Sequence, residues 1–374
     1  MATIAHLANS YGPRSGGLRT AMNELARQYA LAGHDVHLIV PSRESAVLVD
    51  GCVTTHLLKS PVVPRSGGYR VMLGRDRIRA LLEEISPDAL EISDRSTLLF
   101  AADWARERGI PSAVIAHERL DGVIGAFAPW APFTWLADRM NRAAAARADA
   151  IVCTTDFAAE EFSRIGHPVR KVALGVDLVQ FHPGRRSDFW HAQFGGSVVL
   201  LMCTRLSKEK EPGFVLDVLR ECRRRGTDVH LVIAGDGPMA RELHRLSADL
   251  PVTMLGFVVS RSELARILAS ADVILAPGPI ETFGLAALEA LASGTPAIVN
   301  KSSALPEVIG LSAGRALPLD VEVWASAVEL LTAEHAGFRR AARIRAERFT
   351  WQASARRMLS LHGLKFRELE SQAV

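Results

Sequence analysis

The sequence has few cysteines and no long apolar run. Its four cysteines, among 374 residues, form no Cys-x-x-Cys pair. This disfavours a disulfide scaffold and a structural zinc site, and it is typical of thiols that stay reduced in the cytosol. No apolar segment approaches the ~20 residues that span a bilayer, and no basic leader precedes the first apolar stretch. We therefore expect a cytoplasmic protein.

Net charge is also small. The 44 basic residues nearly balance the 41 acidic ones, which leaves a net charge of +3. So small a charge provides no general attraction for nucleic acid, and we expect none as a partner.

What the chain does have is a repeated alternation of strand-like and helix-like segments. Thr3–Ala8 and Asp35–Val40 read as strands around a helix at 16–32, and the rhythm begins again at Ser197–Met202, before a helix at 212–225. Further strands are expected at 112–116, 150–154, 229–234, 252–255, 272–275 and 296–299. This pattern predicts an α/β protein with two doubly wound, Rossmann-like domains of parallel sheet facing a central cleft.

The expected boundary between the domains lies in a polar stretch. Phe181–Asp188 contains Pro183 and Gly184, which are typical of a linker. We therefore expect a first domain at 1–183 and a second at 184–350, with a separate C-terminal segment at 351–374.

Two carboxylates eight positions apart stand out in the second domain. Glu281 and Glu289 follow an expected buried strand at 271–277, and the Gly278-Pro279 pair ends that strand. A helix from Glu281 to Gly294 would leave about 80° and roughly 12 Å between the two side chains, so that both reach one extended ligand. Free N–H groups at its start, those of Phe283, Gly284 and Leu285, would donate to a phosphate or a sugar hydroxyl.

Other candidate binding groups follow strands. Gly16 and Gly17 lie in a glycine loop after the first strand, where backbone amides can approach an anion. The loop lacks the Gly-x-Gly-x-x-Gly spacing, and no acidic residue ends the second strand, so NAD binding is disfavoured. Arg205 and Lys210 follow the first strand of the second domain and can neutralise a diphosphate. A solvated charge run and a plain turn are the alternatives.

These segments resemble the motifs of glycosyltransferase family 4, retaining enzymes of the GT-B architecture. Residues 281–289 resemble its Glu-x7-Glu motif, which implies that Glu281 binds donor-sugar hydroxyls and Glu289 the nucleotide ribose. Residues 204–211 resemble its Gly-Arg-Leu-x-x-Glu-Lys-Gly motif, which implies that Arg205 and Lys210 bind the diphosphate. Thr204 and Glu211 depart from that motif, and Glu211 places a negative charge beside Lys210.

The resemblance implies roles for other residues as well. Gly16 and Gly17 match a double-glycine loop that contacts donor phosphate or acceptor. Gly235 matches a turn near the nucleotide, and Phe257 and Val258 match the segment whose backbone recognises the base. The segment from 351 onward resembles the C-terminal helix that returns to the first, acceptor-binding domain.

His117 follows the strand at 112–116. A histidine in this position is often structural, but the family carries one at the end of an equivalent strand, where it reaches the donor sugar or acceptor. The catalytic candidates are therefore His117, Glu281, Arg205 and Lys210. In these enzymes attack on the same face lets the leaving phosphate oxygen help to take the acceptor proton. With no Asp-x-Asp pair in the sequence, we expect no metal and no cofactor besides the nucleoside-diphosphate sugar substrate.

Residues 279–284 resemble segments of actinobacterial mannosyltransferases that act on glycolipids. The resemblance favours transfer of mannose from GDP-mannose to a lipid-linked or phosphoinositide acceptor. The alternatives are a UDP-sugar-dependent transferase with a soluble acceptor, a sugar-nucleotide epimerase and a non-catalytic sugar-nucleotide-binding subunit.

Two further segments bear on the acceptor. The first is a group of arginines that suits an anionic headgroup or a peripheral position on the inner face of the cell membrane: Arg65, Arg70, Arg75, Arg77 and Arg79. The second is the uncharged stretch 122–137, which contains Phe127, Trp130, Phe133 and Trp135. Together they are consistent with a membrane-docking face or a hydrophobic acceptor channel, and equally with a solvated arginine face and an apolar core.

Overall fold

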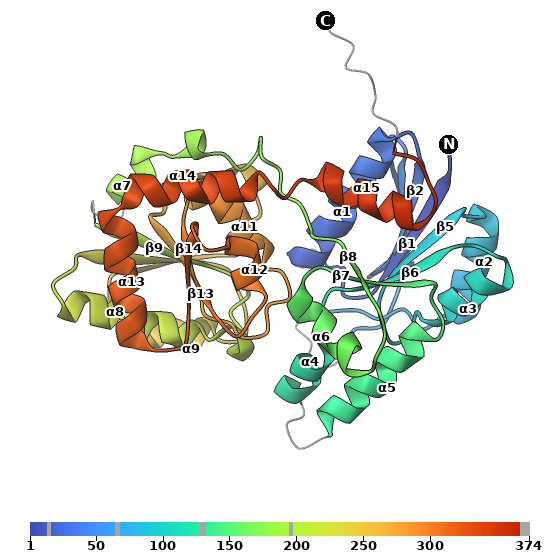
Figure 1. Cartoon of the computed structure of the whole chain (residues 1–374), viewed down its shortest axis with the longest axis horizontal. Coiled ribbons are helices and arrows are strands. Elements are labelled where there is room, and N and C mark those ends of the chain that lie inside the picture. Colours follow the sequence, from blue (N-terminus) through green and yellow to red (C-terminus); the bar gives the residue numbers. More distant parts are fainter. Residues whose placement is uncertain (13–15, 64–67, 128–131, 194–196, 367–374) are drawn as a thin grey trace, which may run out of the picture. The chain divides into compact units, whose positions relative to one another are not determined.

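A computed structural model describes residues 1–12, 16–63, 68–127, 132–193 and 197–366 (Figure 1). The chain forms two compact units. Unit 1 consists of Met1–Gly175 together with Trp351–Val374, and unit 2 is Val176–Thr350. The division after Gly175 falls before the expected boundary at 183, and Pro183–Arg185 forms a 3-10 turn inside unit 2. The last helix, α15 (Trp351–Leu361), belongs to unit 1, where it packs against α1 (Gly17–Leu31).

Unit 1 contains a mostly parallel sheet with the strand order β3-β4-β2-β1-β5-β6-β7-β8. Its strands are β1 (Thr3–Ala8), β2 (Asp35–Ser42), β3 (Ala46–Asp50), β4 (Val53–Lys59), β5 (Ala89–Ser93), β6 (Ser112–Ala116), β7 (Ala150–Cys153) and β8 (Arg170–Lys171). Its other helices are α2 (Arg75–Ile85), α3 (Phe100–Glu107), α4 (Leu120–Phe127), α5 (Phe133–Ala145) and α6 (Asp156–Arg164). Strand β3 pairs antiparallel at the edge, and the strand order reverses between β1 and β5.

The central strands of unit 1 are buried because helices cover the sheet. Every residue of β5 and β6 is buried, as is usual for a parallel sheet. Two ionisable side chains nevertheless lie inside this core, His6 on β1 and Glu91 on β5, with exposed fractions of 1% and 0%.

Unit 2 contains a parallel sheet with the order β11-β10-β9-β12-β13-β14. Its strands are β9 (Val198–Cys203), β10 (Val229–Ala234), β11 (Val252–Gly256), β12 (Val273–Ala276), β13 (Ala297–Asn300) and β14 (Gly314–Leu317). Its helices include α8 (Pro212–Arg224), α9 (Ala240–Leu246), α10 (Arg261–Ser270), α11 (Leu285–Ala292), α12 (Leu305–Ile309), α13 (Val321–Ala333) and α14 (His335–Ala346). The order reverses between β9 and β12, so a crevice is expected at their carboxyl ends.

The expected α/β class with two parallel-sheet domains is confirmed, but the expected helix at 281–294 is wrong at its start. Helix α11 begins at Leu285, and Glu281 precedes it in a turn. Gly284 ends that turn with φ 79°, a left-handed conformation through which a right-handed helix does not continue. The geometry expected from a shared helix therefore does not apply to Glu281 and Glu289.

Candidate active site

A pocket lies in unit 2 where the strand order reverses. The carboxyl ends of β9 and β12 form its floor, and the turn before α11 closes one side. Its polar lining comes from Thr204, Lys210 and Glu281, and Gly278 and Gly284 contribute backbone. Because open parallel sheets bind ligands at this point, the pocket is the first candidate for a ligand site in unit 2.

Lys210 and Glu281 meet in this pocket. Lys210 Nζ donates to Glu281 Oε1 at 2.6 Å, and both side chains are about one-fifth exposed, at 20% and 24%. Lys210 ends the 3-10 turn Lys208–Lys210. The next residue, Glu211, adopts the left-handed conformation with φ 50° that glycine adopts without strain, and α8 begins directly after it. Replacing the motif's glycine by Glu211 therefore leaves Lys210 directed at Glu281.

The turn after β10 supports the loop that leads to Lys210. Gly235 has φ 153°, and a Cβ there would lie 1.8 Å from the carbonyl oxygen of Thr204. Leu206 N–H donates to the Asp236 carbonyl at 3.1 Å, and Met239 N–H donates to the Leu206 carbonyl at 3.0 Å. Gly235 thus packs against the loop that carries Arg205, and its own N–H donates to the Gly256 carbonyl at 2.8 Å.

Glu289 lies on α11 and is nearly buried. Arg261 Nη2 donates to its Oε1 at 2.9 Å, and the guanidinium of Arg261 stacks over the Phe181 ring at 4.7 Å. The carboxylate is therefore oriented by a partner that the sequence analysis missed. In the sequence, this role of Arg261 is indicated only weakly, by its position at the start of the helix after β11.

The start of α11 contributes backbone donors. Gly284 is the N-cap of α11, Leu285 is its first residue, and Gly284 lines the pocket. Phe283 is buried at 4% exposure and packs edge-on against Phe349 with the ring centroids 6.0 Å apart, so its side chain belongs to the core. The first N–H groups of a helix have no hydrogen-bond partner within the helix, so they can donate to an anion bound at its start.

The pocket lining does not include all the predicted residues of unit 2. Lys210, Glu281 and Gly284 are brought together, whereas Arg205, Gly235, Phe257, Val258 and Glu289 do not line this pocket. Arg205 is partly buried on the loop after β9, and Phe257 and Val258 follow β11 at the edge of the sheet, with Phe257 38% exposed.

In unit 1, Gly16 and Gly17 are exposed at the start of α1. His117 follows β6 and is partly buried. Its Nε2 lies 2.8 Å from Ser93 Oγ, and burial, with smaller contributions from His6 and Arg95, lowers the pKa of His117 to about 3. His117 is therefore neutral at physiological pH, and each ring nitrogen either donates or accepts.

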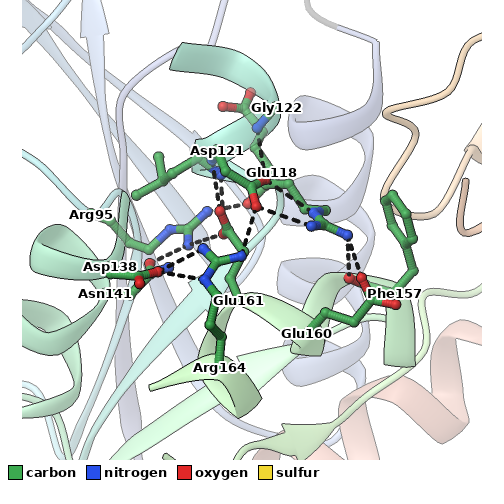
Figure 2. Close-up of polar contacts among 12 residues, drawn as sticks. Arg95, Glu118, Asp121, Gly122, Asp138, Asn141, Phe157, Glu160, Glu161 and Arg164 are labelled. Carbon is green, nitrogen blue, oxygen red and sulfur yellow. Dashed lines mark hydrogen bonds and ion pairs between the residues drawn. The ribbon is translucent and has the colours of Figure 1, made fainter. Parts of the chain in front are cut away.

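A buried charge network holds the chain after His117 (Figure 2). Arg95 donates to Glu161 at 3.1 Å and to Asn141 at 2.6 Å, and it also donates to the carbonyl of Glu118. Glu161 in turn accepts from the N–H groups of Leu120 and Asp121, at 3.0 and 2.7 Å, which neutralises the positive end of α4. The position of the segment after β6 is thus fixed by side chains from the loop after β5, from α5 and from α6.

Around that network Asp121 joins two further arginines. Arg119 and Arg164 both donate to it at 3.0 Å, and although burial opposes the shift, these hydrogen bonds lower the pKa of Asp121 to about 2. Arg164 also binds Asp138 on α5. Helices α4, α5 and α6 are therefore joined by ionised groups.

Two kinds of feature are absent from the described residues. No cluster of three or more histidine, cysteine, aspartate or glutamate side chains there has the arrangement of a metal site. No helix in the same ranges combines the length and apolar character needed to cross a membrane.

Comparison with known proteins gives consistent relationships. Residues 16–175 match the family described as "Glycosyl transferase 4-like domain", and residues 197–334 match "Glycosyl transferases group 1". A GDP-mannose-dependent alpha-(1-6)-phosphatidylinositol dimannoside mannosyltransferase of Mycobacterium tuberculosis is 45% identical over 365 residues, which cover 96% of this chain and 96% of that protein.

Two other similarities are more distant. A GDP-mannose-dependent alpha-mannosyltransferase of Corynebacterium glutamicum is 27% identical over 79% of this chain and 71% of that protein. The structure of sucrose-phosphate synthase from Thermosynechococcus elongatus superposes with a TM-score of 0.81, at 19% identity, over 97% of this chain and 98% of that one, which is evidence for the fold alone. The chain belongs to glycosyltransferase family 4, the retaining glycosyltransferases of the GT-B fold.

Proposed function

We propose that this enzyme transfers mannose from GDP-mannose to a phosphoinositide-type glycolipid. The observation that carries the proposal is the 45% identity, over 96% of both chains, to an enzyme named for that donor and for a phosphatidylinositol dimannoside acceptor. The pocket of unit 2 is compatible with it, because a cation and a carboxylate meet there beside the start of a helix.

In this proposal Lys210 and Glu281 separate from each other when the donor binds, and each then contacts the donor. Lys210, together with Arg205 and the N–H groups at the start of α11, neutralises the diphosphate as negative charge builds on the leaving group. Glu281, released from Lys210, accepts hydrogen bonds from hydroxyls of the mannose and orients its anomeric carbon. The ion pair between them holds both groups close to the positions in which they act.

The remaining donor contacts extend the same assignment. Glu289, oriented by Arg261, binds the ribose hydroxyls, and the backbone of Phe257 and Val258 contacts the base. Gly235 supports the loop of Arg205, and Gly16 and Gly17 present backbone amides to phosphate or acceptor. His117, neutral because of its low pKa, forms a hydrogen bond with a hydroxyl of the donor sugar or acceptor.

The proposed transfer reaction balances without a metal and without a further cofactor. The acceptor hydroxyl oxygen bonds to the anomeric carbon while the bond from that carbon to the diphosphate oxygen breaks. Attack on the same face retains the configuration, and the acceptor proton goes to the leaving phosphate oxygen. GDP and the mannosylated acceptor are the products.

We further propose that basic side chains around α2 hold unit 1 on an anionic membrane surface. Arg75 and Arg79 are exposed on α2, both near the Phe100 ring at 5.6 and 5.8 Å, and Arg77 donates to Ser45 Oγ at 3.1 Å. Arg70 donates to the Ser60 carbonyl at 2.5 Å. Arg65 lies outside the described residues.

The aromatic stretch supplies an apolar complement to these charges. Trp135 on α5 is 58% exposed, with Arg139 over its ring at 5.8 Å, and Phe133 is 37% exposed. Trp130 and the side chain of Phe127 lie outside the described parts. Exposed tryptophan beside arginine suits the interface between lipid headgroups and water.

Radiolabelled sugar donors and phosphatidylinositol dimannoside vesicles test the main proposal. GDP-mannose should give a lipid product whose mass increases by one hexose, whereas UDP-glucose and UDP-N-acetylglucosamine should give none. Thermal unfolding should shift upward with GDP and remain unchanged with UDP, because only a ligand of the native state stabilises it. Transfer from a UDP-sugar in place of GDP-mannose, or conversion of the donor without acceptor, would overturn the proposal.

A further inference from the structure

A chain of buried polar side chains runs through the core of unit 1 and ends at His117. Ser93 Oγ, at the end of β5, lies 2.8 Å from His117 Nε2 and 2.8 Å from His6 Nε2. The other ring nitrogen of His6, Nδ1, lies 3.2 Å from Glu91 Oε2. The residues of this chain come from neighbouring parts of the sheet: His6 is on β1, Glu91 and Ser93 are on the adjacent β5, and His117 follows β6, which lies on the other side of β5.

Glu91 is the origin of this chain and is wholly buried. Its other oxygen, Oε1, accepts from Tyr29 on α1 at 2.8 Å and contacts His362 Nε2, after α15, at 3.3 Å. Burial alone would raise the pKa of Glu91, but the hydrogen bond with His362, together with its neighbours His6 and Tyr29, outweighs burial, and the pKa is lowered. Glu91 is consequently a carboxylate, which only accepts hydrogen bonds.

The proton positions along the chain follow from that carboxylate. A lone pair on His6 Nδ1 would repel Glu91, so Nδ1 carries the proton. Burial lowers the pKa of His6 and keeps the ring neutral, which leaves a lone pair on Nε2. The Ser93 hydroxyl then donates to His6 Nε2, and its oxygen accepts from His117 Nε2–H.

We propose that Glu91 fixes the tautomer of His117 through His6 and Ser93, so that Nε2 carries the proton and Nδ1 is the nitrogen that accepts a hydrogen bond from a substrate hydroxyl. Glu91, His6 and Ser93 are thereby positioning residues. They act on substrate through a ring nitrogen of His117 and need not touch it. The last step rests on the proposed role of His117 in transfer, whereas the tautomer itself does not.

The carboxylate can be changed to a donor without changing its shape. In Glu91→Gln, the amide oxygen continues to accept from Tyr29 and His362, while the amide N–H₂ faces His6 Nδ1. His6 must then carry its proton on Nε2 and donate to Ser93, which donates to His117 Nε2. The substitution reverses both hydrogen bonds of Ser93 and moves the His117 proton to Nδ1.

Nitrogen-15 NMR of the full-length protein, labelled at histidine, reads this directly. Protonated and unprotonated ring nitrogens have well-separated shifts, and the His117 signals are assigned by their loss in His117→Asn. We expect wild-type His117 to be protonated at Nε2 near pH 7.5, and Glu91→Gln to invert it. Tyr29→Phe, which removes a neighbour of Glu91 outside the chain to His117, should leave the tautomer unchanged.

A second variant keeps the inference testable if Glu91→Gln does not fold. Ser93→Ala removes the hydroxyl that joins the two rings, so His117 should no longer be held with its proton on Nε2 and should show shifts averaged between the two forms. Wild-type His117 protonated at Nδ1, or a His117 tautomer that stays fixed at Nε2 in Ser93→Ala, would overturn the inference.

Kinetics separate this inference from the proposed function. Ser93→Ala should lower kcat roughly 10-fold or more with little change in the KM for donor, and it should have no further effect in a His117→Asn background. A correct tautomer with unchanged turnover in both His117→Asn and Ser93→Ala would leave the tautomer chain standing and refute the role of His117 in transfer. A further loss of kcat on adding Ser93→Ala to His117→Asn would show that Ser93 acts on transfer by another route and would overturn the assignment of Ser93 as a positioning residue for His117.

Discussion

At the scale of single residues, the ion pair of Lys210 and Glu281 adds little to the stability of unit 2, although both residues belong to the proposed donor site. Both side chains are partly exposed, and such pairs contribute about 0–1 kcal/mol to the free energy of unfolding. Their removal therefore tests the site without unfolding unit 2.

We expect Glu281→Ala to lower kcat/KM for mannosyl transfer by roughly 100-fold or more, because the hydroxyls of the donor sugar lose their acceptor. The thermal unfolding midpoint should change by no more than a few degrees. Asp217→Ala is the matched control, since it removes an exposed carboxylate paired with Arg220 at 2.8 Å on α8. A Glu281→Ala enzyme as active as this control would refute the assignment.

Lys210→Ala provides a second test at this scale. Loss of a cation at the diphosphate should raise the apparent Kd for GDP roughly 10-fold or more, measured by calorimetry. Lys208→Ala removes an exposed lysine from the same 3-10 turn and should bind GDP like wild type. Equal effects of the two substitutions would mean that only the general charge of the turn matters.

At the scale of elements, the turn before α11 determines where Glu281 lies. A Cβ at Gly284 would lie 2.3 Å from Leu305 Cδ2, and the φ of 79° is itself unfavourable for an alanine. We expect Gly284→Ala to lower the free energy of unfolding by about 1–3 kcal/mol, measured by urea denaturation.

Gly337→Ala is the corresponding control on α14. A Cβ there meets nothing within 4 Å, and the residue is inside a helix. Alanine should therefore raise the stability by about 0.5–1 kcal/mol. A Gly284→Ala protein as stable as wild type would contradict the steric account of the turn.

The proposed binding to membranes depends on the arginines of helix α2. In flotation experiments, Arg75→Ser/Arg79→Ser should bind less to phosphatidylinositol-containing vesicles, and the difference should shrink as salt is added, because these side chains act by charge. Arg220→Ser/Arg224→Ser removes two exposed arginines from α8 of unit 2 and should bind like wild type. Equal loss in both proteins would refute a specific role for α2.

The sequence predicted elements well where local pattern and burial agree. Buried strands such as β6 and β10 have the expected bounds because their mainly apolar stretches end at His117 and at Gly235. The exposed edge strand β3 was missed, since pairing with β4 creates it. The start of α11 was misplaced because the left-handed Gly284 depends on Leu305, a residue 21 positions away in the chain that no local pattern reveals.

The site was predictable to a similar extent. Lys210 and Glu281 could be named from motifs, but their contact depends on how β9 and β12 lie together. Arg261, His6 and Ser93 were missed because their roles exist only through tertiary neighbours. Glu91 left a signal that was not used, because it is an ionisable residue between Leu90 and Ile92, where an unpaired charge would be costly.

At the scale of the whole molecule, acid sensitivity can be traced to a buried carboxylate of unit 2. Asp272 accepts from Val199 N–H at 2.9 Å and lies 3.2 Å from both Arg186 and His335. Burial opposes ionisation, but the contact with His335, the hydrogen bond from Val199 N–H and the charge of Arg186 lower the pKa of Asp272 from 3.8 to about 2.

Because the folded pKa lies below the unfolded one, this stabilisation is present above pH 4 and is lost as the pH falls toward 2. It amounts to about 2 kcal/mol. We expect Asp272→Asn to be less stable than wild type by about that amount at pH 7 and the two proteins to converge near pH 2, measured by urea denaturation across pH. A constant difference at all pH values would show that ionisation of Asp272 is not its source.

The return of α15 to unit 1 has a consequence for synthesis on the ribosome. Unit 2 is continuous in the chain, so it can fold as soon as residue 350 has left the exit tunnel, whereas unit 1 begins first and waits for residues 351–362. Until then α1 lacks its helical neighbour, and Glu91 lacks His362. The half of the enzyme that is translated first is therefore completed last, and a chain that ends at residue 350 should resist protease in unit 2 while remaining susceptible in unit 1.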